Sequence, residues 1–195
     1  METLSRRIIA AWREWELAAS YSMRSVIGSL AVEPNPGRAD QSVMTEQAAA
    51  DEIAGIIADA ARLPLLDAAY ALWRRRYRLG TLEGRPTVEE VRINRTLTPE
   101  QMAAKYRRDR DRAHEGPAFG HLKRAHPGAT DDAIRQAIVM TVKFEDACFK
   151  YFEEMTTAEY WQRCQHAVER ARRDYPGFLE DTYRQAANDV AYYYK

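Results

Sequence analysis

The stretch DDAIRQAIVMTVKFEDACFKYFEEMTTAEYWQRCQHAVERARRDY, residues 131–175, decides the fold class. In its first part, apolar side chains recur every three or four residues, the spacing of one face of an α-helix. They are Ile134, Ile138, Val142, Phe149 and Phe152. Thr156 and Glu159 then match a capping box, the usual start of a new helix. The stretch therefore predicts two antiparallel helices, one ending near 154 and the other near 175, that form a helical hairpin.

Two longer helices are predicted before this hairpin. Apolar residues with helical spacing run through 3–32, and a segment rich in proline and glycine, 34–37, ends that pattern. A second helix begins near Ser42 or Thr45 and continues to about 79. We expect the hairpin to pack against both of these helices.

Pro64 lies inside the second predicted helix. Proline lacks a backbone N–H and crowds the preceding turn, so we expect a kink or a short break near Leu63. The apolar stripe resumes after the proline and includes Tyr70 and Trp73. Both side chains are therefore predicted to be buried on the second half of a kinked helix.

The rest of the chain alternates between clear and unclear segments. Residues 81–98 fit neither a helix nor a strand for long, so they are read as a partly ordered connection. Thr98, Pro99 and Gln101 predict a helix start with a capping box, and that helix should end near Gly116. Residues 116–128 hold three glycines and two prolines and are read as a loop with at most one helical turn.

Together these segments predict an all-α protein. A last helix follows the Pro-Gly pair at 176–177, which gives an irregular helical bundle of five or six helices. A length of 195 residues suits one domain, so 1–195 is read as a single helical domain. A sub-boundary, if there is one, falls in 81–98.

The N-terminal residues and the cysteine count bear on location. Arg and Glu interrupt the first 16 residues, which argues against a signal sequence or a membrane span there. Two cysteines are too few for a disulfide framework. We therefore expect a cytoplasmic protein without membrane association.

Charge is distributed unevenly although the formal net charge is zero. Residues 1–73 carry a net charge of −4, residues 74–126 carry +7, and residues 127–195 carry −3. A basic segment between acidic flanks suits either nucleic-acid binding or internal compensation. The zero total favours compensation, so we predict that some arginines of 74–126 pair with acidic residues of the flanks.

Within that segment, Arg74, Arg75, Arg76 and Arg78 surround Tyr77. Such a mixture of basic and aromatic side chains can stack on bases and pair with phosphates, which makes these residues the nucleic-acid candidates. The same residues also suit the polar end of a helix, where positive charge stabilises the helix dipole. We favour the helix end.

Three histidines, His114, His121 and His126, lie in or beside the predicted loop 116–128. Their spacings of seven and five residues match no familiar zinc pattern. Three separate surface histidines are the favoured interpretation. The alternative is a ligand-binding or proton-transfer site organised by the loop.

Glu145, Cys148 and Cys164 are the third group of candidates. The cysteines lie equally far from the hairpin turn, so their sulfurs should be neighbours across it. Glu145 shares the helix face of Cys148 and should be partly buried, with a raised pKa unless a lysine or arginine reaches it. A packing role is favoured, and a redox or metal-binding pair with Glu145 as a further ligand is the alternative.

Function is the least determined property. Phosphate loops, dinucleotide fingerprints and the serine nucleophile motif are missing from the sequence, which leaves enzymatic activity and any cofactor undecided. No metal is assigned. We favour a helical interaction, scaffold or regulatory protein that binds a protein partner or itself. Tyrosines at 192–194 point in three directions, so at least one should be exposed for such contacts. The alternatives are a nucleic-acid-associated protein using 74–126, and an enzyme or small-ligand binder with a site between helices.

Overall fold

The computed structural model describes residues 36–83, 97–156 and 159–194. The predicted helix at 3–32 and most of the connection at 81–98 lie outside these residues. In the described part the chain forms eight α-helices, one 3-10 turn and no strand, which confirms the all-α class. The elements are α2 (Pro36–Ala61), α3 (Leu65–Arg74), α4 (Arg76–Leu82), α6 (Pro99–Asp111), η1 (Ala113–Glu115), α7 (Pro117–Ala125), α8 (Asp131–Glu154), α9 (Tyr160–Asp174) and α10 (Glu180–Tyr193).

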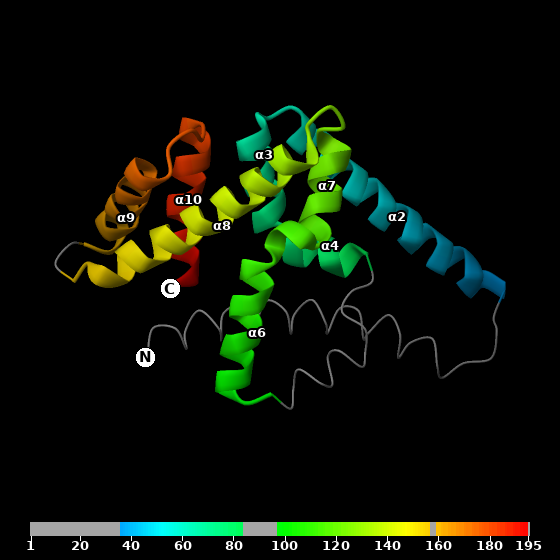
Figure 1. The fold of residues 1–195 in the computed structure, drawn as a ribbon. Helices are drawn as coiled ribbons and strands as arrows, with labels where there is room; N and C mark the ends of the chain where they lie inside the picture. Colours follow the sequence, from blue (N-terminus) through cyan, green and yellow to red (C-terminus); the bar gives the residue numbers. More distant parts are fainter. Residues whose placement is uncertain (1–35, 84–96, 157–158, 195) are drawn as a thin grey trace.

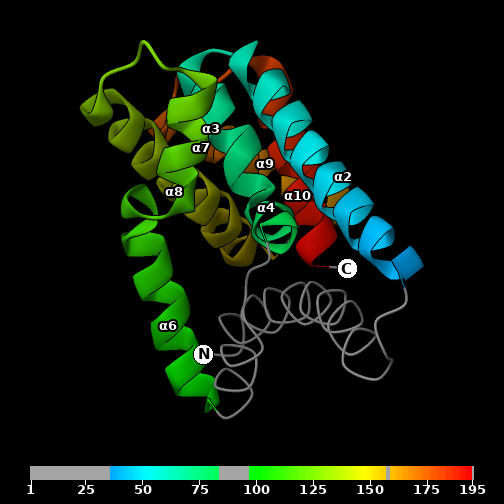
Figure 2. The same cartoon turned by 90° about the vertical axis from the view of Figure 1, so that its right-hand side faces the viewer.

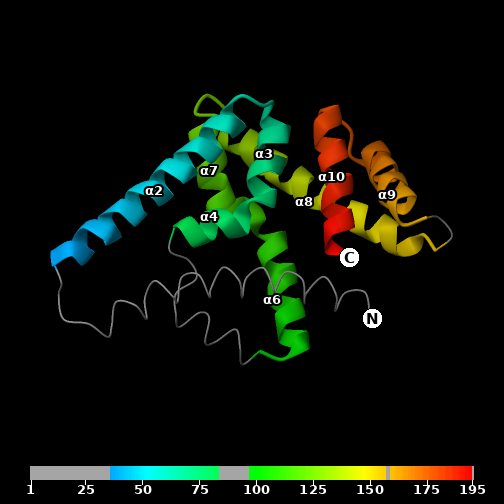
Figure 3. The same cartoon turned by 180° about the vertical axis from the view of Figure 1, so that it is seen from behind.

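Helix α8 is the long diagonal around which the other helices are arranged (Figure 1). At one end it packs against α9, which in turn packs against α10, so the predicted C-terminal hairpin is present. At the other end α8 packs against α3 and α7, and α2 lies across those two. Helix α6 extends away from the rest of the described bundle, and its base meets the η1 turn (Figures 2 and 3).

Pro64 interrupts the second predicted helix as expected. Helix α2 ends at Ala61 and α3 begins at Leu65, with Pro64 in an extended conformation between them. Tyr70 and Trp73 are both buried on α3, which confirms that part of the prediction. A second break at Arg75 separates α3 from α4.

The two capping boxes read from the sequence have different outcomes. Thr98 and Gln101 form one at the start of α6: the Thr98 hydroxyl accepts the Gln101 N–H, and the Gln101 side chain accepts the Thr98 N–H. The second prediction was wrong, because α9 begins at Tyr160 with Glu159 at its N-cap and no side-chain capping bond. Local spacing alone therefore did not fix the start of α9.

The predicted loop at 116–128 was also wrong, because α7 occupies most of it. Pro117 stands in the first turn of α7, where the missing N–H costs nothing. Leu122 and Ala125 are buried, whereas Gly120 is exposed. Glycine and proline here mark the start and the outer face of an amphipathic helix, and packing of its apolar face stabilises it.

Two buried clusters form the core, and α3 and α8 contribute to both. One cluster lies among α3, α8, α9 and α10 and is rich in aromatic side chains around Phe144. The other lies among α2, α3, α7 and α8 and is mostly aliphatic, with Leu122 and Ile134 fully buried. No helix in the described part is long and apolar enough to cross a bilayer.

The side chain of Asp67 connects α3 to the start of α10. Its Oδ1 accepts the Leu179 N–H at 2.8 Å and the Thr182 hydroxyl at 2.6 Å, and its side chain is buried. Asp67→Ala should lower the free energy of unfolding by about 1–3 kcal/mol, because the Leu179 N–H and the Thr182 hydroxyl both lose their acceptor. Urea denaturation measures this, with Asp181→Ala, an exposed acid in the first turn of α10, as the control. Equal effects of the two substitutions would contradict the capping role.

Candidate functional site

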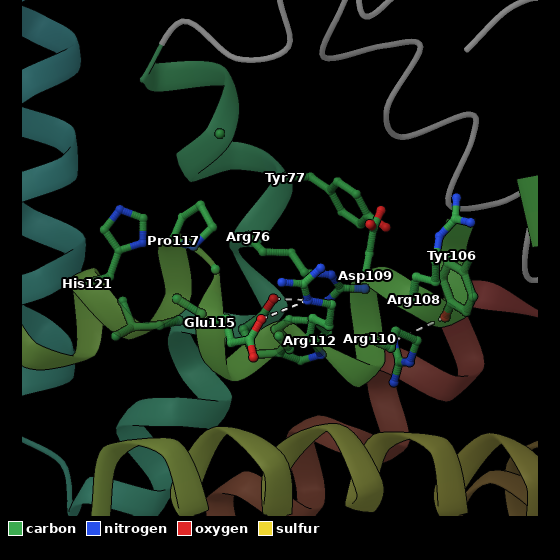
Figure 4. A pocket seen from close by; sticks show the side chains of 16 residues that line it. Arg76, Tyr77, Tyr106, Arg108, Asp109, Arg110, Arg112, Glu115, Pro117 and His121 are labelled. Atoms are coloured by element: carbon green, nitrogen blue, oxygen red, sulfur yellow. Dashed lines mark hydrogen bonds and ion pairs between the residues drawn. The ribbon is translucent and has the colours of Figure 1, made fainter. Parts of the chain in front are cut away.

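A pocket of about 550 Å³ lies where α3 and α4 face α6, η1 and the start of α7 (Figure 4). Leu72 and Trp73 at the end of α3 line one part of it. Arginine and aromatic side chains from α4 and α6 line much of the remainder. The breaks at Arg75 and Arg112 bring these segments together, because each ends one helix beside the pocket. The site is thus assembled from segments about 30 residues apart, with no local motif.

Arg76 is the central cation of this pocket. Its guanidinium lies 4.3 Å from the ring centre of Trp73 and 4.6 Å from that of Tyr77, so aromatic rings cover it. Its Nη1 donates to the Trp73 carbonyl at 2.9 Å and lies 3.6 Å from Glu145 Oε1. Burial acts to lower the pKa of Arg76, but the Tyr77 and Glu145 side chains raise it above its ordinary value. Arg76 is therefore a fixed cation with a defined orientation.

Arg110 and Glu145 form the ion pair beneath Arg76. Arg110 Nη2 lies 2.6 Å from Glu145 Oε2 and 2.8 Å from Asp146 Oδ1, and its Nη1 donates to the Tyr106 hydroxyl at 3.1 Å. Trp73 Nε1 also donates to Glu145 Oε2, at 2.9 Å. The Arg110 side chain is only 6% exposed. These contacts connect α3, α6 and α8 at the base of the pocket.

Glu145 is buried, and two arginines reach it. Burial acts to raise its pKa, but the charges of Arg110 and Arg76 and the hydrogen bonds from Trp73 and Arg110 lower it to about 2. A raised pKa was expected only if no lysine or arginine reached Glu145, and two arginines reach it. Glu145 is an anion that holds two guanidinium groups in place.

The rim of the pocket carries further charge. Arg112 pairs with Glu115 at 2.7 Å (Figure 4). Asp109 pairs with Lys105 at 2.6 Å. Arg108 also lines the pocket, and its side chain makes no ion pair or hydrogen bond with any described residue. The acids of the rim are thus paired, and Arg108 adds a positive charge that no described acid pairs with.

The three histidines have separate environments. His121 is buried at the wall of the pocket, and its Nε2 lies 2.7 Å from Glu83 Oε1, so the prediction of a surface histidine is wrong for this residue. His114 lies beside Glu115, and His126 caps the end of α7. Within 36–83, 97–156 and 159–194, no three His, Cys, Asp or Glu side chains are grouped as metal ligands.

The two cysteines belong to the aromatic core cluster. Both are buried free thiols in that one cluster. The Cys164 thiol donates to the Tyr160 carbonyl at 3.3 Å, and burial raises its pKa, which disfavours the reactive thiolate. Their closeness across the hairpin stays a prediction, as does a redox role.

The arginines of residues 74–78 contact different parts of the protein. Arg74 binds Asp189 of α10 through two hydrogen bonds of 2.9 and 2.8 Å, and Arg78 binds Glu52 of α2 at 2.8 and 2.5 Å. These contacts confirm that acidic flanks compensate part of the basic segment. Arg75 does not line the pocket, whereas Arg76 and Tyr77 do.

Sequence reasoning missed Tyr106, Arg108 and Arg110. Residues 105–112 alternate basic and acidic side chains, which reads as an exposed helix with internal ion pairs. The Tyr106–Arg110 spacing of four residues was the available signal for one shared face. This spacing does not reveal that Arg110 is buried and forms an ion pair with Glu145.

Comparison with known proteins adds no functional information for this site. A scan against protein-family models gives no matching family, and searches of curated proteins and of solved structures give no match.

Proposed function

We propose that this protein binds a small ligand bearing an oxyanion, a carboxylate or a phosphate, in the pocket between α4 and α6. The observation that carries the proposal is the arrangement of Arg76. Aromatic rings hold its guanidinium, and Glu145 fixes one of its terminal nitrogens from beneath. An arginine held in this way has lost its side-chain entropy before a ligand arrives, which favours binding.

Arg76 also has donor groups left for a ligand. Its hydrogen bond and its ion pair with described residues both involve Nη1, and its side chain is 18% exposed. A planar guanidinium presents its N–H groups in a fork that matches two oxygens of a carboxylate or phosphate. Arg108 supplies a second cation at the same pocket.

The size and surroundings of the site favour a small ligand over a nucleic acid. Pockets of roughly 300–1,000 Å³ are typical of small-molecule sites, and this one is about 550 Å³. Arg74 and Arg78, which could extend a phosphate-binding track, are held by Asp189 and Glu52. A nucleic acid would have to displace both ion pairs.

A protein partner or self-association is the second candidate function. Tyr192 is 67% exposed and Trp161 is 44% exposed, whereas Tyr193 and Tyr194 pack on Phe149. Exposed aromatic side chains are enriched at protein interfaces, which supports this candidate. Sedimentation of wild type and of a Tyr192→Ser, Trp161→Ser variant tests self-association, and equal behaviour as monomers would exclude it.

Substituting Arg76 tests the proposed anion site. Inorganic phosphate, compared with chloride at equal ionic strength, should raise the melting temperature of the wild type, because binding to the folded state stabilises it. In Arg76→Gln the apparent affinity for phosphate should fall about 10- to 100-fold, the effect of a lost charge-assisted hydrogen bond. Arg76→Lys should bind more weakly than the wild type, since lysine lacks the planar fork.

Arg75→Gln is the matched control, because Arg75 precedes Arg76 and lies outside the pocket lining. It should bind phosphate like the wild type. Equal losses in the two glutamine variants, or no phosphate effect in the wild type, would contradict the proposal.

A further inference from the structure

We infer that the ligand is an organic anion whose apolar, ring-sized body lies along α4, between Arg76 and the His121–Glu83 pair. This inference rests on the proposed anion site and adds the class of ligand. It follows from the order of side chains along the pocket, from the chemistry of the end that is far from the arginines, and from the space left there.

Helix α4 sets the order. Arg76, Gly80 and Glu83 are four and three residues apart, so they share one face over two turns. Arg76 begins this face, Gly80 follows one turn later, and Glu83 reaches His121 of α7. In Figure 4 the His121 and Pro117 side chains lie on the opposite side of the pocket from Tyr106, Arg108 and Arg110. The pocket therefore has a cationic end and a second end closed by α7.

Small and apolar residues line the part near α7. They are Gly80, Ala113, Gly116, Pro117 and Ala118. The pocket wall is open at Gly80, because a Cβ added there would meet no atom within 4 Å. The backbone conformation of Gly80 is one that any residue adopts. The neighbours of Gly80 thus leave space that a side chain, or a ligand, could fill.

The polar groups at this end are already bonded to each other. His121 Nε2 and Glu83 Oε1 lie 2.7 Å apart, and the His121 side chain is 7% exposed. The pair therefore needs no polar group from a ligand. Glu115, which lines the same part of the pocket, is likewise paired with Arg112 at 2.7 Å, and the other residues there are small or apolar. An inorganic anion at Arg76 would leave this surface in contact with water, whereas a ring would cover it.

The test compares anions with and without a ring. Binding of inorganic phosphate, phenyl phosphate, acetate and benzoate is measured by calorimetry on the full chain. In the wild type, phenyl phosphate should bind about tenfold or more tightly than phosphate, and benzoate likewise relative to acetate, because the ring buries apolar surface. The better of the two aromatic anions identifies whether the head group is a phosphate or a carboxylate.

Gly80→Leu places a side chain where the ring should lie. It should remove the tenfold gain of both aromatic anions and leave phosphate and acetate within about twofold of wild type. Gly55→Leu is the matched control: Gly55 is also helical and also has open space at its Cβ, but it lies on α2 outside the pocket lining. It should bind all four anions like the wild type.

The results separate the two proposals. If phenyl phosphate and benzoate bind no better than the small anions, or if Gly80→Leu keeps their advantage, the inference about the ring is overturned and the anion site stands. If none of the four anions binds, or if Arg76→Gln binds them all like wild type, the anion site itself is wrong. If the tighter binding of the aromatic anions is lost in Gly80→Leu and kept in Gly55→Leu, the result supports an organic anion with a ring as the ligand.

Discussion

Glu145→Ala is expected to lower the free energy of unfolding by about 3–5 kcal/mol, the usual cost of removing one partner from a buried ion pair. The carboxylate neutralises Arg110, which is nearly fully buried, and also faces Arg76. It accepts the indole N–H of Trp73 as well. Without it, the largely buried guanidinium groups of Arg76 and Arg110 lose the acid that they share. Urea denaturation of the wild type and the variant measures the effect.

Asp146→Ala provides the matched control for this substitution. Asp146 follows Glu145 and also contacts Arg110, at 2.8 Å, but its side chain is 44% exposed. Solvent screens such a pair, so its loss should cost about 1 kcal/mol or less. If both variants lost a similar amount of unfolding free energy, the buried position of Glu145 would not make its ion pairs stronger than the exposed one of Asp146. If Glu145→Ala does not fold, Glu145→Gln, which keeps the shape, provides the measurement.

Glu145 also predicts a dependence of stability on pH. Its pKa is about 2 in the folded protein and near 4.5 when unfolded, so the unfolded state binds its proton first as pH falls. The stabilisation is fully present above about pH 4.5 and is lost as pH falls toward 2. The stability difference between wild type and Glu145→Gln should therefore narrow over this interval. A difference that is constant from pH 6 to pH 2 would contradict the assignment.

Phe144→Ala is expected to lower the free energy of unfolding by about 3–5 kcal/mol, because it leaves a cavity in a packed core. Phe144 is fully buried, and its ring centre lies 4.7 Å from that of Phe178 and 5.5 Å from that of Tyr183. It therefore joins α8 to α10 and to the segment before it. The same denaturation experiment measures the loss.

Met140→Ala, one turn earlier on α8, is the control for Phe144→Ala. Met140 is 36% exposed, so its truncation should cost much less. Similar losses at the two positions would mean that the aromatic cluster is not a main source of stability. Phe144→Leu keeps most of the apolar volume, so its loss of unfolding free energy should be intermediate between those of Phe144→Ala and Met140→Ala.

The helices were largely predictable, because hydrophobic periodicity and proline act locally. The stripe on 131–154 gave α8, and Pro64 gave the break between α2 and α3. Helix α7 was missed because its glycine and proline suggest a loop when packing is unknown. The stability of this nine-residue helix comes from contacts with α2, α3 and α8, which the local sequence does not contain.

The candidate site was predictable only in pieces. Glu145 was singled out because it interrupts an apolar stripe, and Arg76 because it stands in a basic run. Their association depends on a contact between α4 and α8 across 69 positions of sequence, which periodicity cannot supply. Periodicity assigns a face to each residue, but the tertiary packing decides which faces meet. For the same reason Arg110 seemed exposed until its contact with Glu145 was known.

The most direct test of the anion site is an NMR titration of the arginine side-chain Nε–H signals with phenyl phosphate, with Arg76 assigned by its absence in Arg76→Lys. Binding at the proposed site predicts that the Arg76 signal shifts saturably with added ligand, while that of Arg75, outside the pocket lining, stays in place. An Arg76 signal that does not move while phenyl phosphate shifts other arginines, or while it shifts none, would contradict the proposed function.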